Sequence, residues 1–251
     1  MVSLAYQLRR SAHDLARYPR SWLRRVRPPP SVKLFGVRLL TDERLSPSVY
    51  RDIVAERFER GEALALSCCL RSGDVVLEVG TGMGLLAAMA ALRVGSERVT
   101  TYEANPHLLP IIRENFALNG VAPTLVHALA DLTGGTGRLY LNSELYSSSG
   151  HHRPTSRQRI PVPRVDLRRE ILRLRPTVLV MDVEGAEDHL LPAIPYEALD
   201  RLLVEVHPEI LGAVRATELV REVEGHGLRV DRRLSTRRFK LFRRSSGRAR
   251  P

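Results

Sequence analysis

The sequence predicts an α/β protein with a seven-stranded, mostly parallel sheet and helices on both faces. Strand-like and helix-like patterns alternate between residues 74 and 206, as expected for consecutive βαβ units. The first unit is the clearest, because a short apolar run at residues 75–79 precedes three glycines and an apolar stretch at residues 85–92. Two late segments, residues 228–230 and 239–242, are expected to form a terminal hairpin.

A glycine-rich turn follows the first predicted strand. Gly80, Gly82 and Gly84 stand at alternate positions, with Thr81 inside the turn and Glu78 before it. Glycines allow a positive φ and a close approach of ligand to backbone, and ligands bind at this edge of open α/β sheets. The spacing differs from the G-x-G-x-x-G of dinucleotide sites. It resembles the nucleoside-binding loop of class I S-adenosylmethionine-dependent methyltransferases, which have a Rossmann-like fold. Glu78 suits the cationic end of that ligand and would repel a diphosphate.

A second acid, Glu103, ends the next predicted strand and is followed by Ala104. It comes one βαβ step, about 20 residues, after the glycine turn. A carboxylate there can accept hydrogen bonds from both ribose hydroxyls, the alternative being a solvated strand-end acid. Asp131 follows the third predicted strand, residues 125–128, and is expected to meet the adenine amino group unless it is a simple turn aspartate.

Composition favours a one-domain enzyme of the cytoplasm. A chain of 251 residues can bury a full core. It contains no apolar run of about 18 residues that could span a bilayer, and no clean secretory signal. The only cysteines, Cys68 and Cys69, are adjacent, and we expect them to be reduced thiols in a buried helix.

The net charge of +11 is concentrated at the two ends. Residues 1–30 hold seven Arg and one Asp, and residues 232–251 hold eight Arg, one Lys and no acid. The body between them is mildly acidic, whereas nucleic-acid enzymes usually carry a basic groove at the active site. Nucleic acid is therefore not expected as the main partner. The basic ends could contact an anionic membrane, such as the inner membrane face, or remain solvated.

The expected organisation is an N-terminal helical extension and cap (residues 1–72), a catalytic domain (73–244) and a basic tail (245–251). We expect an amphipathic helix at residues 1–27, a hairpin at 32–40 and one or two capping helices at 47–70. A helix at 105–120 is expected to be capped by Asn105, with Pro106 as its first residue. Two extended segments are expected at 137–141 and 160–165. The polar segment 142–159 between the extended segments is expected to be a binding loop, a lid or disordered.

A second group of acids follows a later predicted strand, residues 177–181. Asp182 ends this strand, Glu184 lies in the turn and Glu187 follows in the next helix. Carboxylates this close repel each other unless a metal, a cation or a shared proton offsets the charge. A favourable helix-dipole position accounts for Glu187 but not for Asp182. His207 ends a further strand and can act as a general base, with a surface histidine as the alternative.

These motifs resemble those of the FkbM-family methyltransferases. Members pair a glycine loop of the form D-x-G-A-N-x-G with a later D-x-E-G-A-E turn, and residues 182–187 match the second motif in full. The resemblance covers residues 73–210. It also includes Glu103, Asn115, Asn119, Glu205 and His207. The glycine loop here lacks the family's Ala-Asn, so the contacts of that asparagine cannot be carried over. The resemblance implies an O-methyltransferase acting on a hydroxyl of a sugar, glycolipid or polyketide-type natural product.

Methyl transfer from a sulfonium is an in-line displacement, which depends mainly on orientation. A hydroxyl also needs to lose its proton, and Asp182 or His207 could accept it, with Glu184 as a further catalytic candidate. A divalent cation such as Mg²⁺, held by Asp182 with Glu184 or Glu187, could instead lower the hydroxyl pKa. The expected cofactor contacts are Glu78, Gly80, Thr81, Gly82, Gly84, Glu103, Ala104, Asp131 and Asp182.

Two other functions stay open. An RNA or protein methyltransferase could use the basic ends as a clamp, although amino-methylating nucleic-acid enzymes usually carry an Asn-Pro-Pro or Asp-Pro-Pro turn where residues 182–184 stand here. A non-catalytic cofactor-binding scaffold is the other, and the retained acids Glu78, Glu103 and Asp182 argue against it.

Overall fold

The structure, a computed structural model, describes residues 29–142 and 156–244. The expected helix at residues 1–27, the tail at 245–251 and most of the polar segment 142–159 lie outside the described residues. The roles proposed for the basic ends, and the division into extension, domain and tail, therefore stay predictions. No helix in the described part of the chain is long and apolar enough to cross a membrane.

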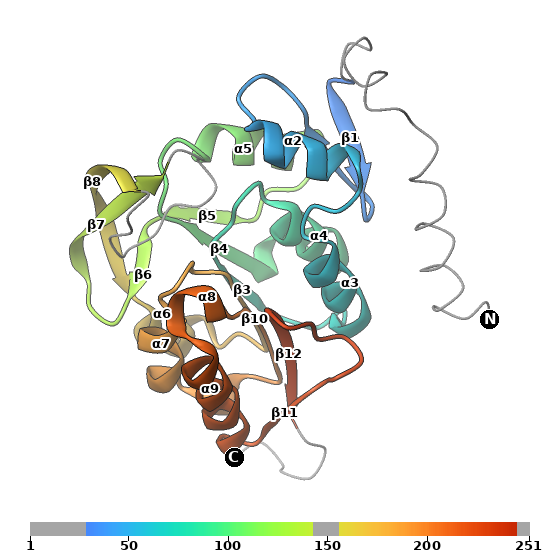
Figure 1. The fold of residues 1–251 in the computed structure, drawn as a ribbon. Coiled ribbons are helices and arrows are strands. Elements are labelled where there is room, and N and C mark those ends of the chain that lie inside the picture. Colours follow the sequence, from blue (N-terminus) through green and yellow to red (C-terminus); the bar gives the residue numbers. More distant parts are fainter. Residues whose placement is uncertain (1–28, 143–155, 245–251) are drawn as a thin grey trace.

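The main sheet has seven strands, which confirms the predicted fold class (Figure 1). All neighbouring pairs between β10 and β5 are parallel, and β12 is antiparallel to both of its neighbours. In sheet order the strands are β11 (Leu228–Val230), β12 (Phe239–Arg244), β10 (Arg201–Glu205), β9 (Val178–Met181), β3 (Val76–Val79), β4 (Val99–Glu103) and β5 (Thr124–His127).

Helices cover both faces of this sheet because its central strands are apolar on both sides (Figure 1). On β9, Val178 and Val180 pack with one group of helices, whereas Leu179 and Met181 pack with the other. The first group contains α3 (Arg60–Cys69), α4 (Leu85–Val94) and α5 (Leu109–Leu118), and the second contains α6 (Leu167–Leu174), α7 (Glu187–Leu190) and α9 (Ala213–Gly225). The shorter helices are α2 (Pro47–Val54), α8 (Pro208–Leu211), η2 (Ser96–Arg98), η4 (Leu191–Ala193) and η5 (Tyr196–Ala198).

The predicted N-terminal hairpin is present as β1 (Ser31–Leu34) and β2 (Val37–Leu40). Asn115 of α5 and Asn119, the residue that caps the end of α5, fasten it to the domain. Asn115 accepts a hydrogen bond from the Leu40 amide and donates one to the carbonyl of Met83 in the glycine turn. Asn119 accepts a hydrogen bond from the Arg38 amide. These asparagines, part of the family resemblance, therefore connect the hairpin to the glycine turn.

The predicted start of α5 was wrong. The helix begins at Leu109 and not at Pro106. The reason is local: residues 106–108 form a turn, in which the Leu108 amide donates a hydrogen bond to the Asn105 carbonyl, before the helix begins. The Asn105 side chain accepts a hydrogen bond from the His107 amide, as a capping side chain does, and so caps this turn. The prediction for the cysteines was wrong in part, since Cys69 is buried but Cys68 is exposed; both are free thiols.

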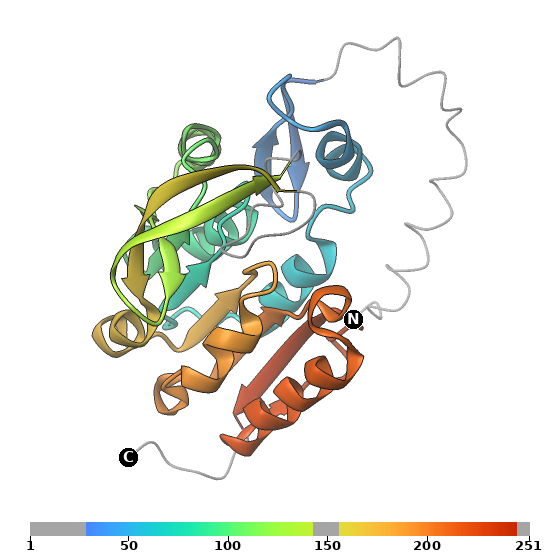
Figure 2. The same cartoon turned by 60° about the vertical axis from the view of Figure 1, so that its left-hand side comes forward.

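A small three-stranded sheet projects from the main sheet (Figure 2). Its strands are β6 (Leu129–Asp131), β8 (Ser156–Asp166) and β7 (Gly135–Asn142), which contain both predicted extended segments. Leu139 of β7 and Val162 of β8 belong to its small apolar core. Because β6 follows β5 directly, this sheet starts at the carboxyl edge of the main sheet.

Candidate active site

The glycine turn follows β3 and touches the end of β9. Gly80 has φ of 90°, and a Cβ atom at this position would collide with the carbonyl oxygen of Asp182. Gly84 has φ of 81°, and its Cβ would lie 2.7 Å from the Phe116 ring. The two glycines therefore serve different purposes. Gly80 brings the strand ends together at the site, whereas Gly84 allows α4 and α5 to pack.

Glu78 lies beneath this turn and is buried. The hydroxyl of Thr101 donates a hydrogen bond to its carboxylate, and the hydroxyls of Thr101 and Thr81 are 2.6 Å apart. Burial raises the pKa of Glu78 to about 8, in spite of the hydrogen bond from Thr101. Neither Glu78 nor Thr81 lines the pocket described next. Both side chains contact Thr101 next to the turn, and their predicted contact with the cofactor stays a prediction.

A pocket opens at the carboxyl edge, where β3, β4 and β9 end. Glu103 lines it, and its carboxylate accepts hydrogen bonds from the backbone amides of Gly82 and Asn105, at 3.1 and 2.8 Å. Burial raises the pKa of Glu103 to about 7, although these amides favour the charged form. The lining residues are Val79, Gly80, Tyr102, Glu103, Ala104, Ala128, Leu129, Ala130, Leu139, Asp182, Val183 and Ala186. Four predicted cofactor residues, Gly80, Glu103, Ala104 and Asp182, thus meet in one pocket.

The Asp131 carboxylate contacts side chains that do not line the pocket. Its carboxylate pairs with Arg164 at 2.9 Å and with His189 at 3.0 Å. Burial opposes its charge, but the Leu132 amide, His189 and Arg164 outweigh that effect and lower the pKa of Asp131. Its neighbour Ala130 lines the pocket, whereas Asp131 does not. The predicted bond from Asp131 to an adenine amino group stays a prediction.

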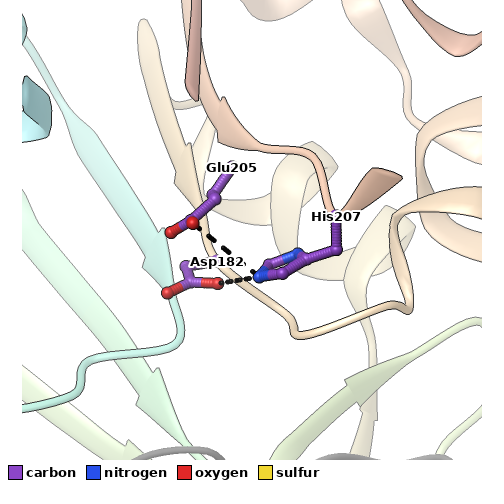
Figure 3. Close-up of side chains that lie close together, drawn as sticks. All are labelled: Asp182, Glu205 and His207. Carbon is purple, nitrogen blue, oxygen red and sulfur yellow. Dashed lines mark ion pairs between the residues drawn. The ribbon is translucent and has the colours of Figure 1, made fainter. Parts of the chain in front are cut away.

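Asp182, Glu205 and His207 converge next to the pocket (Figure 3). Asp182 follows β9, Glu205 ends β10 and His207 lies two residues later, so neighbouring parallel strands deliver all three to one edge. The Nε2 atom of His207 is 3.8 Å from Asp182 Oδ1 and 3.9 Å from Glu205 Oε1. Asp182 Oδ1 is buried although the side chain as a whole is 46% exposed, and this local burial, followed by repulsion from Glu205 and Glu184, raises the pKa of Asp182 above its usual range.

Glu187 fixes the orientation of the His207 ring by contacting Nδ1, whereas Asp182 and Glu205 approach Nε2. Both side chains are fully buried, and Glu187 Oε1 lies 2.6 Å from His207 Nδ1. With a carboxylate on Nδ1, that nitrogen carries the proton and Nε2 faces Asp182 and Glu205. Burial opposes protonation of His207, but Glu187, Asp182 and Glu184 outweigh it and raise its pKa to about 9. Glu187 was predicted as a metal ligand or a helix-end acid, and the structure places its carboxylate against Nδ1 of His207.

Glu184 also approaches this histidine, with Oε2 3.6 Å from His207 Nε2. Its φ of 50° is unusual for a residue other than glycine, and strained backbone of this kind occurs often at functional sites. The three predicted catalytic residues, Asp182, His207 and Glu184, are thus brought together.

Two further acids, Glu59 and Glu62 of the α3 region, were not predicted. A Cβ atom on Gly82 would lie 3.2 Å from Glu59 Oε1, which places Glu59 at the glycine turn. Burial and the charges of Glu78 and Glu62 raise the pKa of Glu59 well above its usual range. The one signal in the sequence is their spacing of three residues, which puts both acids on one side of a helix start.

The pocket fits S-adenosylmethionine. Gly80 brings backbone to the pocket wall, and the carboxylate of Glu103 lines the same pocket, where a carboxylate can accept hydrogen bonds from ribose hydroxyls. Among the described residues that line the pocket, the charged side chains are those of Glu103 and Asp182, which would repel a diphosphate.

Comparison with known proteins supports this assignment. Residues 63–138 match the family model for ribosomal protein L11 methyltransferase (PrmA). The L11 methyltransferase of Geobacter metallireducens is 48% identical over 64 residues, which cover 25% of this chain and 21% of that protein. The release factor glutamine methyltransferase of Chlorobaculum tepidum is 31% identical over 122 residues, covering 45% and 41%. The aligned region thus spans about a fifth of the L11 enzyme.

A solved structure agrees in fold. The protein SMU.776, described as a candidate methyltransferase in complex with SAH, superimposes with a TM-score of 0.50 and 11% identity, covering 86% of this chain and 56% of that one. The family match contains the glycine turn and Glu103 but ends before Asp182. The chain therefore has the Rossmann-like fold of the class I S-adenosylmethionine-dependent methyltransferases, and its residues 63–138 are similar in sequence to enzymes of that class.

Proposed function

We propose that this protein transfers the methyl group of S-adenosylmethionine to a side-chain nitrogen of a protein or amino acid. The observation that carries the proposal is the excess of carboxylates beside the cofactor pocket. Three acids, Asp182, Glu184 and Glu205, lie 3.6–3.9 Å from His207 Nε2, and burial, followed by repulsion from Glu205 and Glu184, raises the pKa of Asp182 well above its usual range. Burial also raises the pKa of Glu59, Glu62 and Glu205, and the charges of neighbouring acids add to it. An acceptor that brings a positive charge relieves that repulsion.

The cofactor half of the proposal rests on Glu103 and the glycine turn. Bound S-adenosylmethionine supplies an electrophilic methyl group on a sulfonium. Glu103 holds the ribose, and Gly80, which also lines the pocket, contributes backbone to the wall against which the ligand lies. Asp182 lines the same pocket and also belongs to the acidic group, so it stands between the methyl donor and the acceptor. This arrangement aligns the two reactants for an in-line transfer.

The acceptor half follows from charge. An ammonium or guanidinium group pairs well with carboxylates in a partly buried site. The nitrogen must lose a proton to become a nucleophile, and Asp182, which lines the pocket, lies where it can accept it. The relatives support this choice, because their names include ribosomal protein L11, release factor glutamine and arginine Nω methyltransferases. They match mainly the cofactor half, so the acceptor is proposed here chiefly from the acidic group.

A labelling experiment tests the acceptor class. The full chain is incubated with methyl-labelled S-adenosylmethionine and a desalted extract of the producing organism. We expect label in acid-precipitable, protease-sensitive material, and in N-methylated amino acids after acid hydrolysis. Label confined to protease-resistant glycans, lipids or small molecules would contradict a nitrogen acceptor. Heat-treated chain and the Asp182→Asn variant are the controls.

A hydroxyl acceptor is the second candidate function. It is favoured by the D-x-E-G-A-E turn at residues 182–187, which resembles that of FkbM-family O-methyltransferases. The convergence of Asp182, Glu205 and His207 also suits the activation of a neutral hydroxyl. In the same labelling experiment, this candidate predicts label in glycolipid, sugar or natural-product fractions. A non-catalytic scaffold predicts cofactor binding with no transfer to any fraction.

A further inference from the structure

We propose that Asp182, Glu205 and His207 bind a divalent transition-metal ion of the Mn²⁺, Fe²⁺ or Zn²⁺ class. The site lies at the carboxyl ends of β9 and β10, beside the cofactor pocket (Figure 3). The inference goes beyond the proposed function, because ion binding can be measured with no methyl acceptor present.

The ligand atoms have the spacing of a metal site. One nitrogen of His207 and one oxygen from each acid lie within 4.8 Å of one another. Two ligands that each lie about 2.1 Å from one ion are at most about 4.2 Å apart. The two distances from His207 Nε2, 3.8 Å to Asp182 and 3.9 Å to Glu205, fall within that limit. A small inward movement of the two carboxylates would complete the site.

Buried atoms without hydrogen bonds point into the same space. Among the described residues, His207 Nε2 and Asp182 Oδ1 are buried and have no hydrogen-bond partner. The His207 side chain is only 1% exposed, so water does not satisfy this nitrogen from outside. Buried polar atoms are nearly always satisfied in folded proteins. A metal ion between them would satisfy both at once.

The contacts of the second ring nitrogen of His207, Nδ1, are also those of a metal-binding histidine. Glu187 binds Nδ1 at 2.6 Å and is itself fixed by the Gly185 amide at 3.1 Å. A carboxylate on one ring nitrogen sets the tautomer and directs the other nitrogen to the metal, as is general for metal-binding histidines. Glu187 is therefore a positioning residue, and the D-x-E-G-A-E turn supplies both a ligand, Asp182, and this positioning acid.

The ligand types indicate which ion binds. Mg²⁺ prefers oxygen ligands and several waters, whereas imidazole nitrogen suits Zn²⁺ and Fe²⁺, and carboxylates suit Mn²⁺. One histidine with two carboxylates therefore favours a first-row transition ion over the Mg²⁺ expected from the acids alone.

The test is a titration of chelator-treated full chain with Mn²⁺, Zn²⁺ and Mg²⁺, followed by calorimetry and, for Mn²⁺, by electron paramagnetic resonance. We expect one Mn²⁺ or Zn²⁺ per chain and at least tenfold weaker binding of Mg²⁺. Asp182→Asn and His207→Gln should each weaken binding of Mn²⁺ by tenfold or more. Glu187→Gln should weaken it by about 10- to 100-fold and shift the visible spectrum of bound Co²⁺.

The matched control is Asp188→Asn, an exposed acid of α7 that pairs with Arg215 and should leave ion binding unchanged. Because His207 is buried, its variant could unfold. The Asp182 side chain is 46% exposed, so Asp182→Asn keeps the test valid. The proposal is overturned if the chain binds no ion stoichiometrically, if Mg²⁺ binds as tightly as Mn²⁺, or if folded Asp182→Asn binds normally. Transfer activity that survives complete removal of the ion would overturn a role in catalysis and leave the proposed function intact.

Discussion

The two edges of the main sheet differ in how completely their buried charged and polar side chains are hydrogen-bonded. At the amino edge, Arg201 and Asp74 form a buried bidentate pair, with contacts of 2.6 and 3.0 Å. Thr177 donates a further hydrogen bond to Asp74, and Arg201 donates one to the Cys69 carbonyl. At the carboxyl edge, by contrast, His207 Nε2 and Asp182 Oδ1 are buried with no hydrogen-bond partner among the described residues.

This difference separates stability from function. A buried pair with every hydrogen bond made holds the strands β3, β9 and β10 in register, and its loss destabilises the fold. Buried groups that repel one another cost stability, and they persist where a ligand completes them. The pKa values agree with this difference, because the pKa values of Glu78, Glu103 and Asp182, which lie at the carboxyl edge, are all raised.

The largest expected effect is on turnover. Asp182→Asn keeps the shape of the side chain and removes its charge, so we expect methyl transfer to fall by roughly 10² to 10⁴-fold. The affinity for S-adenosylmethionine should change only modestly, since Glu103 and the glycine turn remain. Single-turnover assays together with calorimetry would separate the two quantities. Near-normal turnover would remove Asp182 from the chemistry.

The amino edge should behave in the reverse manner. Arg201→Met leaves Asp74 buried and unpaired, which should lower the free energy of unfolding by about 3–5 kcal/mol. The folded fraction should still bind S-adenosylmethionine with normal affinity. Urea denaturation with and without ligand would measure both effects. A stability loss below about 1 kcal/mol would show that the two edges do not differ as described.

Loss of the ribose acid should have an intermediate effect. Glu103→Ala removes charge-assisted hydrogen bonds, which should cost roughly 1.5–3 kcal/mol of binding free energy, or about 10- to 150-fold in affinity. The matched control is Glu97→Ala, an exposed acid in η2 near the amino end of β4. Equal affinities for both variants would exclude Glu103 from ribose binding.

The smallest effect expected is on the pH dependence of cofactor binding. The pKa of Glu103 is raised to about 7, and the proton must leave for the carboxylate to accept both ribose hydroxyls. Affinity should therefore be constant above pH 7 and fall as the pH drops through 7 toward 6, by up to about tenfold per unit. Calorimetry of wild type and Glu103→Gln between pH 5.5 and 8.5 would check the sign. The variant should show no such dependence.

Much of this contrast could be predicted from the sequence. Strand and helix periods, glycine spacing and acids at strand ends are local signals, and parallel strands bring their ends together. Asp182, Glu205 and His207 could therefore be placed at one edge. The partners of Asp131 could not, because Arg164 and His189 come from β8 and α7 through tertiary packing. The roles of Glu59 and Glu187 depend likewise on how α3 packs and how His207 is turned.

The most direct test of the account is calorimetric titration of the full wild-type chain with S-adenosylmethionine, with NADH as the competing ligand class. The account predicts one site per chain with a dissociation constant in the micromolar range or better, and no saturable binding of NADH. A chain that binds NADH, or that binds S-adenosylmethionine no better than Glu103→Ala does, would contradict the assignment of the carboxyl edge as a methyl-donor site.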